Sequence, residues 1–391
     1  MGRAVSNADF RTTRSRLLVA LHAFRSHARQ SVGWLVTWPT LWRAWLRLVA
    51  APPRRLTAWA SPRAPVALVA SGENRRPLTL TLSPQSRGEG TRGSSRVWIL
   101  TALLLVGGSM CSSSRAAEPD LIRLTTDGHL KQRPCWSPDG QQVVFARHQG
   151  DTIFLFLRDL MTGKEERLTK QTAPEYDAVF SPEGKELLLS FDKLSPNQGD
   201  IEVYRLALSD RSLAPLATTR GALSHEESPC WSPDGKRFAF TSTRHGNQEL
   251  YVADVMGGEW QRLTEDAAID AHPAWSPDGQ TIAFATDRWG DLEIALIHPD
   301  GSNLRRLTDS KSLDDYPAWS PDGRHVAFTS NRDGNLEIYV QPLAGPARNV
   351  TRDPAIDNFP AWTPDGRIGF VSNRDDGFDL YTVEWRTAGS K

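Results

Sequence analysis

A five-residue pattern, Trp-Ser-Pro-Asp-Gly or a close variant, recurs six times in this chain at intervals of 43 to 51 residues, and it limits the fold more than any other feature. Each copy begins with an aromatic residue, and these are Trp136, Phe180, Trp231, Trp275, Trp319 and Trp362. A regular period of this length is typical of a domain built from similar, adjacent units. We therefore expect one repeat domain over residues 118–391, with no room for a second domain.

The fifth copy shows what one unit builds. Apolar and polar residues alternate in Tyr316–Trp319, His325–Ser330 and Leu336–Val340, and a further short strand follows at residues 349–351. The segment Ser320-Pro321-Asp322-Gly323 has the residues of a type I turn. Four antiparallel strands in a period of about 44 residues predict an all-β chain folded as a six-bladed β-propeller.

The count of fourth strands predicts how the ring closes. The first five copies each end in a segment such as Arg262-Leu263-Thr264, but the sixth copy has none. An unused segment of the same kind, Arg123-Leu124-Thr125, precedes the first copy. We expect this N-terminal strand to complete the last blade, because closure removes exposed sheet edges. The six motif aromatics are expected to pack between neighbouring blades.

Charge divides the chain into two unlike parts. Residues 1–95 contain 15 arginines, no lysine and three acids, whereas residues 118–391 contain 29 basic and 43 acidic residues. The acidic part is unsuited to nucleic acid or anionic lipid. Residues 1–95 are interpreted as a disordered or mis-annotated extension. The alternative is a cytoplasmic arm in which Trp34, Trp38, Trp42 and Trp45 lie on an amphipathic helix.

Residues 96–117 have the pattern of a secretory signal peptide. The apolar run Val-Trp-Ile-Leu-Thr-Ala-Leu-Leu-Leu-Val-Gly-Gly at 97–108 follows Arg92 and Arg96, and small residues lead to Ala117. Cleavage after Ala117 would release residues 118–391 to the periplasm or the exterior. The alternative is a buried helix, and no apolar run is long enough for a confident membrane span.

The repeated segments Pro-Ala-Trp-Ser-Pro-Asp-Gly, Ile-Ala-Phe, Glu-Ile-Tyr and Arg-Leu-Thr resemble those of the TolB family propeller, from Leu121 to about Trp385. The resemblance implies a periplasmic interaction module that docks a protein partner, an envelope lipoprotein in that family, at the mouth of its channel. Nothing in residues 1–120 resembles the α/β domain of that family, so the resemblance implies a TolB-like propeller and leaves its place in a Tol-type complex open.

An acidic column lies five residues before each motif aromatic. Its members are Lys131, Glu175, Glu226, Asp270, Asp314 and Asp357, and Asp177, Glu227 and Asp315 follow closely. First strands of propeller blades line the channel, so we expect these acids to ring one mouth. Their mutual repulsion would be relieved by a basic peptide of a partner or by a cation, with calcium as the candidate. The alternative is that they are ordinary polar residues of connecting loops.

A weaker hypothesis is a metal-dependent enzyme. His225, Glu226, Asp270 and His272 come from adjacent blades and are residue types that bind transition metals. Such a site would suit a lyase or lactone hydrolase acting on an envelope or extracellular carbohydrate or lactone. No Gly-x-Ser-x-Gly or His-Glu-x-x-His motif is present. We therefore expect a monomeric binding protein without a cofactor. The third possible function is that of a scaffold protein that binds its partner through the outer surfaces of the blades.

Two further sets of residues are expected to be structural. Cys135 and Cys230 each precede a motif Trp, where other copies have Val or Ala, so they are predicted to be buried free thiols in blades too far apart for a disulfide. Arg244, Arg288, Arg332 and Arg374 recur in the loop between the second and third strands, and we assign them to packing or turn geometry.

Overall fold

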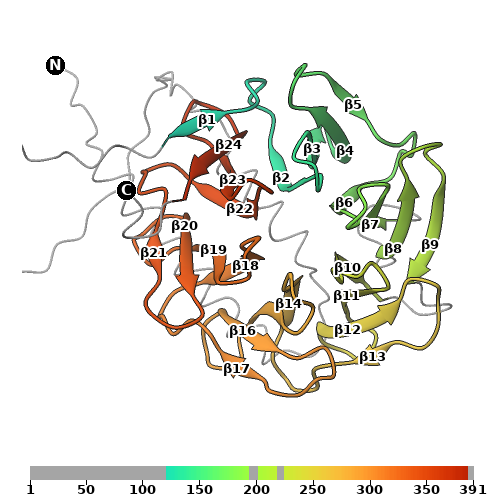
Figure 1. Ribbon diagram of the computed structural model, residues 1–391, viewed down its shortest axis with the longest axis vertical. Coiled ribbons are helices and arrows are strands. Elements are labelled where there is room, and N and C mark those ends of the chain that lie inside the picture. The colour runs from blue at the N-terminus through green and yellow to red at the C-terminus, as the bar shows by residue number, and fades with distance from the viewer. Residues whose placement is uncertain (1–119, 193–200, 218–223, 386–391) are drawn as a thin grey trace, which may run out of the picture. The chain divides into compact units, whose positions relative to one another are not determined.

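The computed structural model describes residues 120–192, 201–217 and 224–385, and within these ranges every regular element is a β-strand. The strands form six four-stranded antiparallel sheets arranged as the blades of a propeller (Figure 1). The all-β, six-bladed prediction is confirmed. Residues 1–117, with the predicted extension and signal peptide, lie outside the described residues. No helix that could cross a membrane occurs in the described part of the chain.

Each of the first three blades is a meander of consecutive strands. Blade 1 consists of β2 (Lys131–Trp136), β3 (Gln142–Gln149), β4 (Thr152–Asp159) and β5 (Glu165–Arg167). Blade 2 consists of β6 (Glu175–Phe180), β7 (Glu186–Asp192), β8 (Ile201–Ala207) and β9 (Leu213–Ala217). Blade 3 consists of β10 (Glu226–Trp231), β11 (Arg237–Ser242), β12 (Glu249–Asp254) and β13 (Gln261–Arg262).

The remaining blades repeat this order until the chain returns to its start. Blade 4 consists of β14 (Asp270–Trp275), β15 (Ile282–Thr286), β16 (Glu293–Ile297) and β17 (Arg305–Arg306). Blade 5 consists of β18 (Asp314–Trp319), β19 (His325–Ser330), β20 (Glu337–Pro342) and β21 (Arg348–Asn349). Blade 6 consists of β22 (Asp357–Trp362), β23 (Arg367–Ser372), β24 (Asp379–Glu384) and the N-terminal strand β1 (Leu121–Arg123).

The turn between the first and second strands has the conformation that its residues predict. In blade 5 the Ser320 hydroxyl donates to Asp322 (2.5 Å) and accepts from the His325 amide (3.0 Å), while the Gly323 amide donates to the Ser320 carbonyl. Gly323 has φ +68°, a left-handed conformation that residues other than glycine rarely adopt. This compact hairpin explains why the motif recurs so uniformly.

The core lies between blades, and the motif aromatics are in it, as predicted. The indole N–H of Trp231 donates to the carbonyl of Val179 in the preceding blade, and Trp319 and Trp362 repeat this contact with Ala274 and Ala318. Trp136 packs with Phe359 and Val371 of blade 6 and so seals the junction between the first and last blades.

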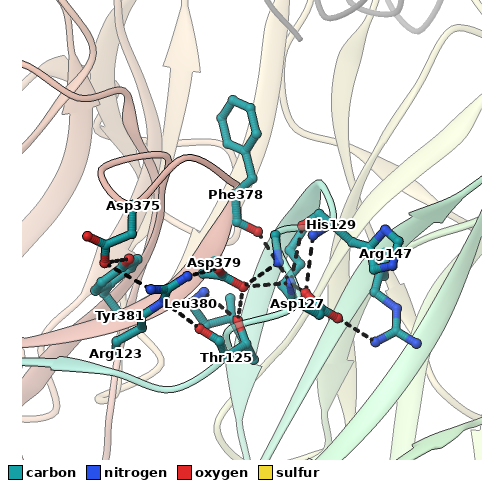
Figure 2. A network of polar contacts seen from close by, with 12 residues as sticks. Arg123, Thr125, Asp127, His129, Arg147, Asp375, Phe378, Asp379, Leu380 and Tyr381 are labelled. Carbon is teal, nitrogen blue, oxygen red and sulfur yellow. Dashed lines mark hydrogen bonds and ion pairs between the residues drawn. The ribbon is translucent and has the colours of Figure 1, made fainter. Parts of the chain in front are cut away.

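Polar contacts of buried side chains lock the closing strand β1. Its residue Ile122 pairs with Thr382 of β24. Asp379 accepts hydrogen bonds from Arg123 (2.7 Å) and Thr125 (2.7 Å), and Lys131 of blade 1 makes an ion pair with it at 3.0 Å (Figure 2). Lys131 also pairs with Asp127. Both Lys131 and Asp379 are fully buried, so closure by the N-terminal strand carries a buried ionic network that links blades 1 and 6.

Candidate functional site

All six innermost strands share one backbone irregularity. The pairing of β2, β6, β10, β14, β18 and β22 with the next strand shifts register in the middle, as at a β-bulge. In each strand the third residue adopts a left-handed conformation with φ between 49° and 58°, although none is glycine, and these residues are Arg133, Asp177, Ser228, His272, Tyr316 and Phe359. Such residues are strained, and a bulge turns a side chain away from its regular direction.

These six residues line a hollow of about 110 Å³ at the centre of the ring, which we call the central hollow. The strands that carry them are the ones nearest the ring axis in Figure 1. The other lining residues from the inner strands are Gln132, Tyr176, Glu227, Ala271 and Asp315, and those from outside these strands are His148, Ile153, Ser190, Ile201, Gln248, Ile269 and Leu292. All six blades therefore contribute to one concave site.

One side of the central hollow is built around Asp177. Its carboxylate makes an ion pair with the Arg133 Nε at 2.9 Å and accepts hydrogen bonds from the backbone N–H and the hydroxyl of Ser228, both at 3.3 Å. The Arg133 guanidinium also lies 5.1 Å from the centroid of the Tyr316 ring. A single arginine thus joins residues of blades 1, 2 and 5.

The other side is an aromatic stack. His272 stacks on Tyr316 with ring centroids 4.1 Å apart and ring planes inclined by 25°, and Phe359 meets Tyr316 edge to face at 4.7 Å. The His272 Nδ1 is 2.6 Å from the Asp315 carboxylate, which also accepts the Tyr316 amide at 2.7 Å. Burial, with the nearby Asp315 charge, raises the pKa of the Tyr316 phenol well above its ordinary value, so the phenol is a neutral hydroxyl.

The acidic column does not form the predicted ring of charge. Asp270, Asp314 and Asp357 are fully buried, and each accepts two hydrogen bonds from one arginine of its own blade: Arg288, Arg332 and Arg374, at 2.7 to 3.1 Å. The prediction was wrong because each inner strand begins at the column residue, which pairs with the end of the second strand beside that arginine. These arginines therefore bind carboxylates within the fold.

The column glutamates are also enclosed. Glu226 is fully buried and accepts hydrogen bonds from Ser224 and Ser242, both at 2.8 Å. Glu175 is fully buried and accepts from Thr169 and from the Leu155 amide. Burial raises the pKa of Glu175, as it does for Asp270 and, to about 6, for Asp357. Of the predicted rim acids, only Asp177, Glu227 and Asp315 line the central hollow.

The four residues of the metal hypothesis do not converge. His225 hydrogen-bonds to Glu227 at 2.9 Å and His272 to Asp315, whereas Glu226 and Asp270 have the separate partners given above. Among the described residues no group of three His, Cys, Asp or Glu side chains is arranged to hold a metal ion. The predicted metal-ligand set is therefore wrong. The two histidines each hydrogen-bond to a carboxylate outside the set, and Glu226 and Asp270 are buried carboxylates with hydrogen-bond partners in their own blades.

Cys135 and Cys230 are free, as predicted, but the residues are partly exposed rather than fully buried. Desolvation of the sulfur raises the pKa of the Cys135 thiol to about 11 and that of the Cys230 thiol to about 12. The Cys230 sulfur accepts the backbone N–H of Trp275 at 3.0 Å. Both thiols are therefore packing groups of the blade interfaces.

Sequence reasoning missed the position that shapes the site. The left-handed residue lies two places after the acidic column, and its identity changes in every blade, whereas the residue after it is proline in five of six. A position that varies inside an otherwise uniform repeat was the available signal.

Comparison with known proteins agrees with this architecture. The family described as TolB beta propeller domain matches residues 217–316 and 310–390. The Tol-Pal system protein TolB of Francisella tularensis subsp. mediasiatica is 31% identical over 122 residues, which are 31% of this chain and 27% of that protein. The chain thus matches about a quarter of the length of this curated relative.

Solved structures give the same fold. TolB from Acinetobacter baumannii has 26% identity and a TM-score of 0.54, over 61% of this chain and 59% of that chain. A structure described as a TolB of Agrobacterium tumefaciens has 23% identity and a TM-score of 0.55, over 68% of this chain and 97% of that chain. Six blades closed by the N-terminal strand, the family match and these likenesses lead to one conclusion: this chain folds as a TolB-like β-propeller.

Proposed function

We propose that this protein is an exported protein-interaction module that binds a segment of a partner in the central hollow. The observation that carries the proposal is the set of six left-handed residues, each different, which the bulged inner strands present to one concave site. Strained backbone of this kind persists where the surrounding structure holds it, and it clusters at binding sites. The curated relative belongs by name to a Tol-Pal system, which supports a protein as the ligand.

The site has the composition of a protein-binding pocket. Aromatic side chains of Tyr176, Tyr316 and Phe359 provide apolar contact area, while Arg133, Asp177 and Glu227 supply charged groups. A small number of fixed polar groups among aromatic walls favours a bound side chain or chain end over a flat protein surface.

Site-specific crosslinking tests the proposal. A photoreactive residue replacing Gln132, in the hollow, is compared with one replacing Met161, which is 87% exposed on the β4–β5 turn. Cells expressing the full chain are irradiated, and crosslinked partners are identified by mass spectrometry. We expect a partner from position 132 and not from position 161. A partner captured only at the outer turn, or at neither place, would refute binding in the hollow and favour the outer blade surfaces.

Charge reversal of the column acids is not a suitable test. Asp270 and Asp314 are buried against Arg288 and Arg332, so a lysine there would leave two cations facing each other inside the blade. Such variants report on folding. Tyr176→Ala is the better loss-of-binding variant, because Tyr176 lines the hollow, is only partly buried and carries no buried charge.

Export is the second part of the proposal. Cleavage after Ala117 would leave the acidic propeller in the periplasm or the exterior, where a partner in the envelope is accessible. Fractionation of cells, followed by determination of the N-terminus of the accumulated protein, tests it. An N-terminus near Glu118 in the periplasmic fraction supports export, whereas full-length protein in the cytoplasm contradicts it.

A further inference from the structure

We propose that the central hollow is a subsite for one guanidinium or primary ammonium group of the bound partner. In the free protein the side chain of Arg133 occupies the position for this group, between the Asp177 carboxylate and the Tyr316 ring, which we call the cradle. The inference rests on the proposed function, because it specifies the chemistry of the segment that enters the same site. It is carried by the surroundings of Arg133.

The Arg133 guanidinium has the environment that proteins use to recognise a cationic side chain. Its Nε lies 2.9 Å from the Asp177 carboxylate, and its centre lies 5.1 Å from the Tyr316 ring centroid. A carboxylate on one side and an aromatic face on the other bind a cation by ion pairing and by the ring quadrupole. The cradle comes from blades 2 and 5, whereas Arg133 comes from blade 1.

The cradle itself is rigid. Tyr316 contacts the stacked ring of His272 and, in a T-shaped arrangement, the ring of Phe359, and its backbone N–H donates to Asp315. Asp177 is fixed by Ser228, whose backbone N–H also donates to Ser190 at 3.2 Å. Preorganised groups of this kind bind a cation without paying for their own ordering.

Arg133 is less firmly placed than its cradle. Its side chain is 21% exposed, and it is held by the ion pair with Asp177 and the face of Tyr316. A long flexible side chain with one ion pair in a partly solvated site contributes little net stability, so a second guanidinium can replace it with small loss. The hollow beside it has room for several water molecules and therefore for an incoming head group.

The charge of the lining favours a cation over an anion. The described residues that line the hollow include three carboxylates, those of Asp177, Glu227 and Asp315, and one guanidinium, that of Arg133. His225 and His272 are hydrogen-bonded to Glu227 and Asp315 and offset part of this charge when protonated. An anionic ligand would meet three carboxylates, whereas a basic side chain that displaces Arg133 restores the same ion pair.

Removal of the resident arginine tests this inference directly. The full chain and its Arg133→Ala variant are titrated with N-acetyl-arginine amide and with the uncharged citrulline analogue by isothermal titration calorimetry. We expect Arg133→Ala to bind the arginine probe at least tenfold more tightly than the unsubstituted protein does, and to bind the citrulline probe no better. Adding Asp177→Asn to that variant should abolish the gain. Arg211→Ala, which removes an outer arginine paired with Glu166, is the matched control and should change nothing.

Equal affinity for the arginine and citrulline probes, or no gain in Arg133→Ala, would overturn the inference. If Arg133→Ala does not fold by circular dichroism, Arg133→Met keeps the apolar stem and answers the same question. The result is separable from the proposed function. A partner crosslinked at position 132 with no arginine selectivity would leave the module intact and remove only the cation subsite.

Discussion

Replacing Gly369 with alanine should destabilise the propeller, although alanine is common at this position of the repeat. Gly369 pairs with Ala361 of the inner strand, and the corresponding residues of the other blades are Val144, Leu188, Ala239, Ala283 and Ala327. A Cβ added to Gly369 would lie 1.9 Å from Cη2, 2.3 Å from Cζ3 and 2.7 Å from Cζ2 of Trp136. No real Cβ contact is that short, so either the indole or strand β23 must move.

The expected magnitude follows from two opposing effects. Overpacking a core by one methyl group costs about 1–3 kcal/mol, and three overlapping ring atoms place this case in the upper part of that range. The change from glycine to alanine in a strand returns about 0.5–1 kcal/mol. We expect a net loss of about 1–2.5 kcal/mol, which corresponds to a fall in Tm of about 2–5 °C for a domain of this size.

Thermal unfolding followed by tryptophan fluorescence measures the effect. The second variant, Trp136→Phe with Gly369→Ala, removes the ring atoms that clash, so the cost of the alanine should largely vanish in that background. Ala327→Gly, at the matching site of blade 5, is the control: alanine should be the more stable residue there, by about 1–2 kcal/mol, because Ala327 is fully buried and meets no such clash. A Gly369→Ala protein as stable as the parent would refute the reasoning, and so would an alanine that costs as much in the Trp136→Phe background as it does in the parent.

Three further outcomes are expected. Asp379→Asn should lower the free energy of unfolding in urea by about 3–5 kcal/mol, because it removes a negative charge that compensates the buried Lys131. The control Asp309→Asn, where Asp309 is 84% exposed and pairs with Arg306 at the surface, should cost less than about 1 kcal/mol. Equal effects of the two variants would contradict a stabilising buried ion pair between Lys131 and Asp379. Burial acts to raise the pKa of Asp379, but hydrogen bonds from Thr125, Arg123 and Lys131 outweigh it and hold the pKa below 3.8. The stability that the Asp379 carboxylate gives the folded protein is therefore present above pH 3.8 and is lost as the pH falls through the folded pKa. The Tm difference between the parent and Asp379→Asn should shrink between pH 6 and pH 3, and a constant difference would count against this assignment. The raised thiol pKa values of Cys135 and Cys230 should slow their alkylation at pH 8 by about 100-fold or more relative to the unfolded chain, as read by peptide mapping, and rapid labelling of either residue in the folded protein would show that its sulfur is not desolvated.

The fold was predictable because its information is local and repeated. The turn Ser320-Pro321-Asp322-Gly323 and the alternation in β19 specify one hairpin, and five further copies specify the same hairpin again. The missing sixth copy of the last strand and the spare segment at Arg123 identified the closure, which β1 and β24 confirm. Each of these inferences needed only spacing along the chain.

The site was harder to predict because it depends on register and on long-range pairing. Spacing placed Asp314 near the ring axis but could not show that Arg332, 18 residues later, returns to neutralise it. The bulge after Asp315 was also hidden, because left-handed backbone at a residue such as Tyr316, directly before proline, has no signature in composition. An arginine recurs about 18 residues after the acid in blades 3 to 6, and in blades 4 to 6 it pairs with that acid; this recurrence was the clue to the first of these errors.

The position of β1 has a consequence for the order in which the chain folds. Arg123 and Asp379, which meet in the last blade, are separated by 256 residues, so the ring cannot close until nearly the whole propeller sequence is present. Contacts this distant in sequence carry a large loop-closure entropy and form late. Until then, strand β1 has no partner, because β24 is the last strand of the propeller to be made. A nascent chain would therefore be the species most exposed to aggregation, and the one that most needs a chaperone.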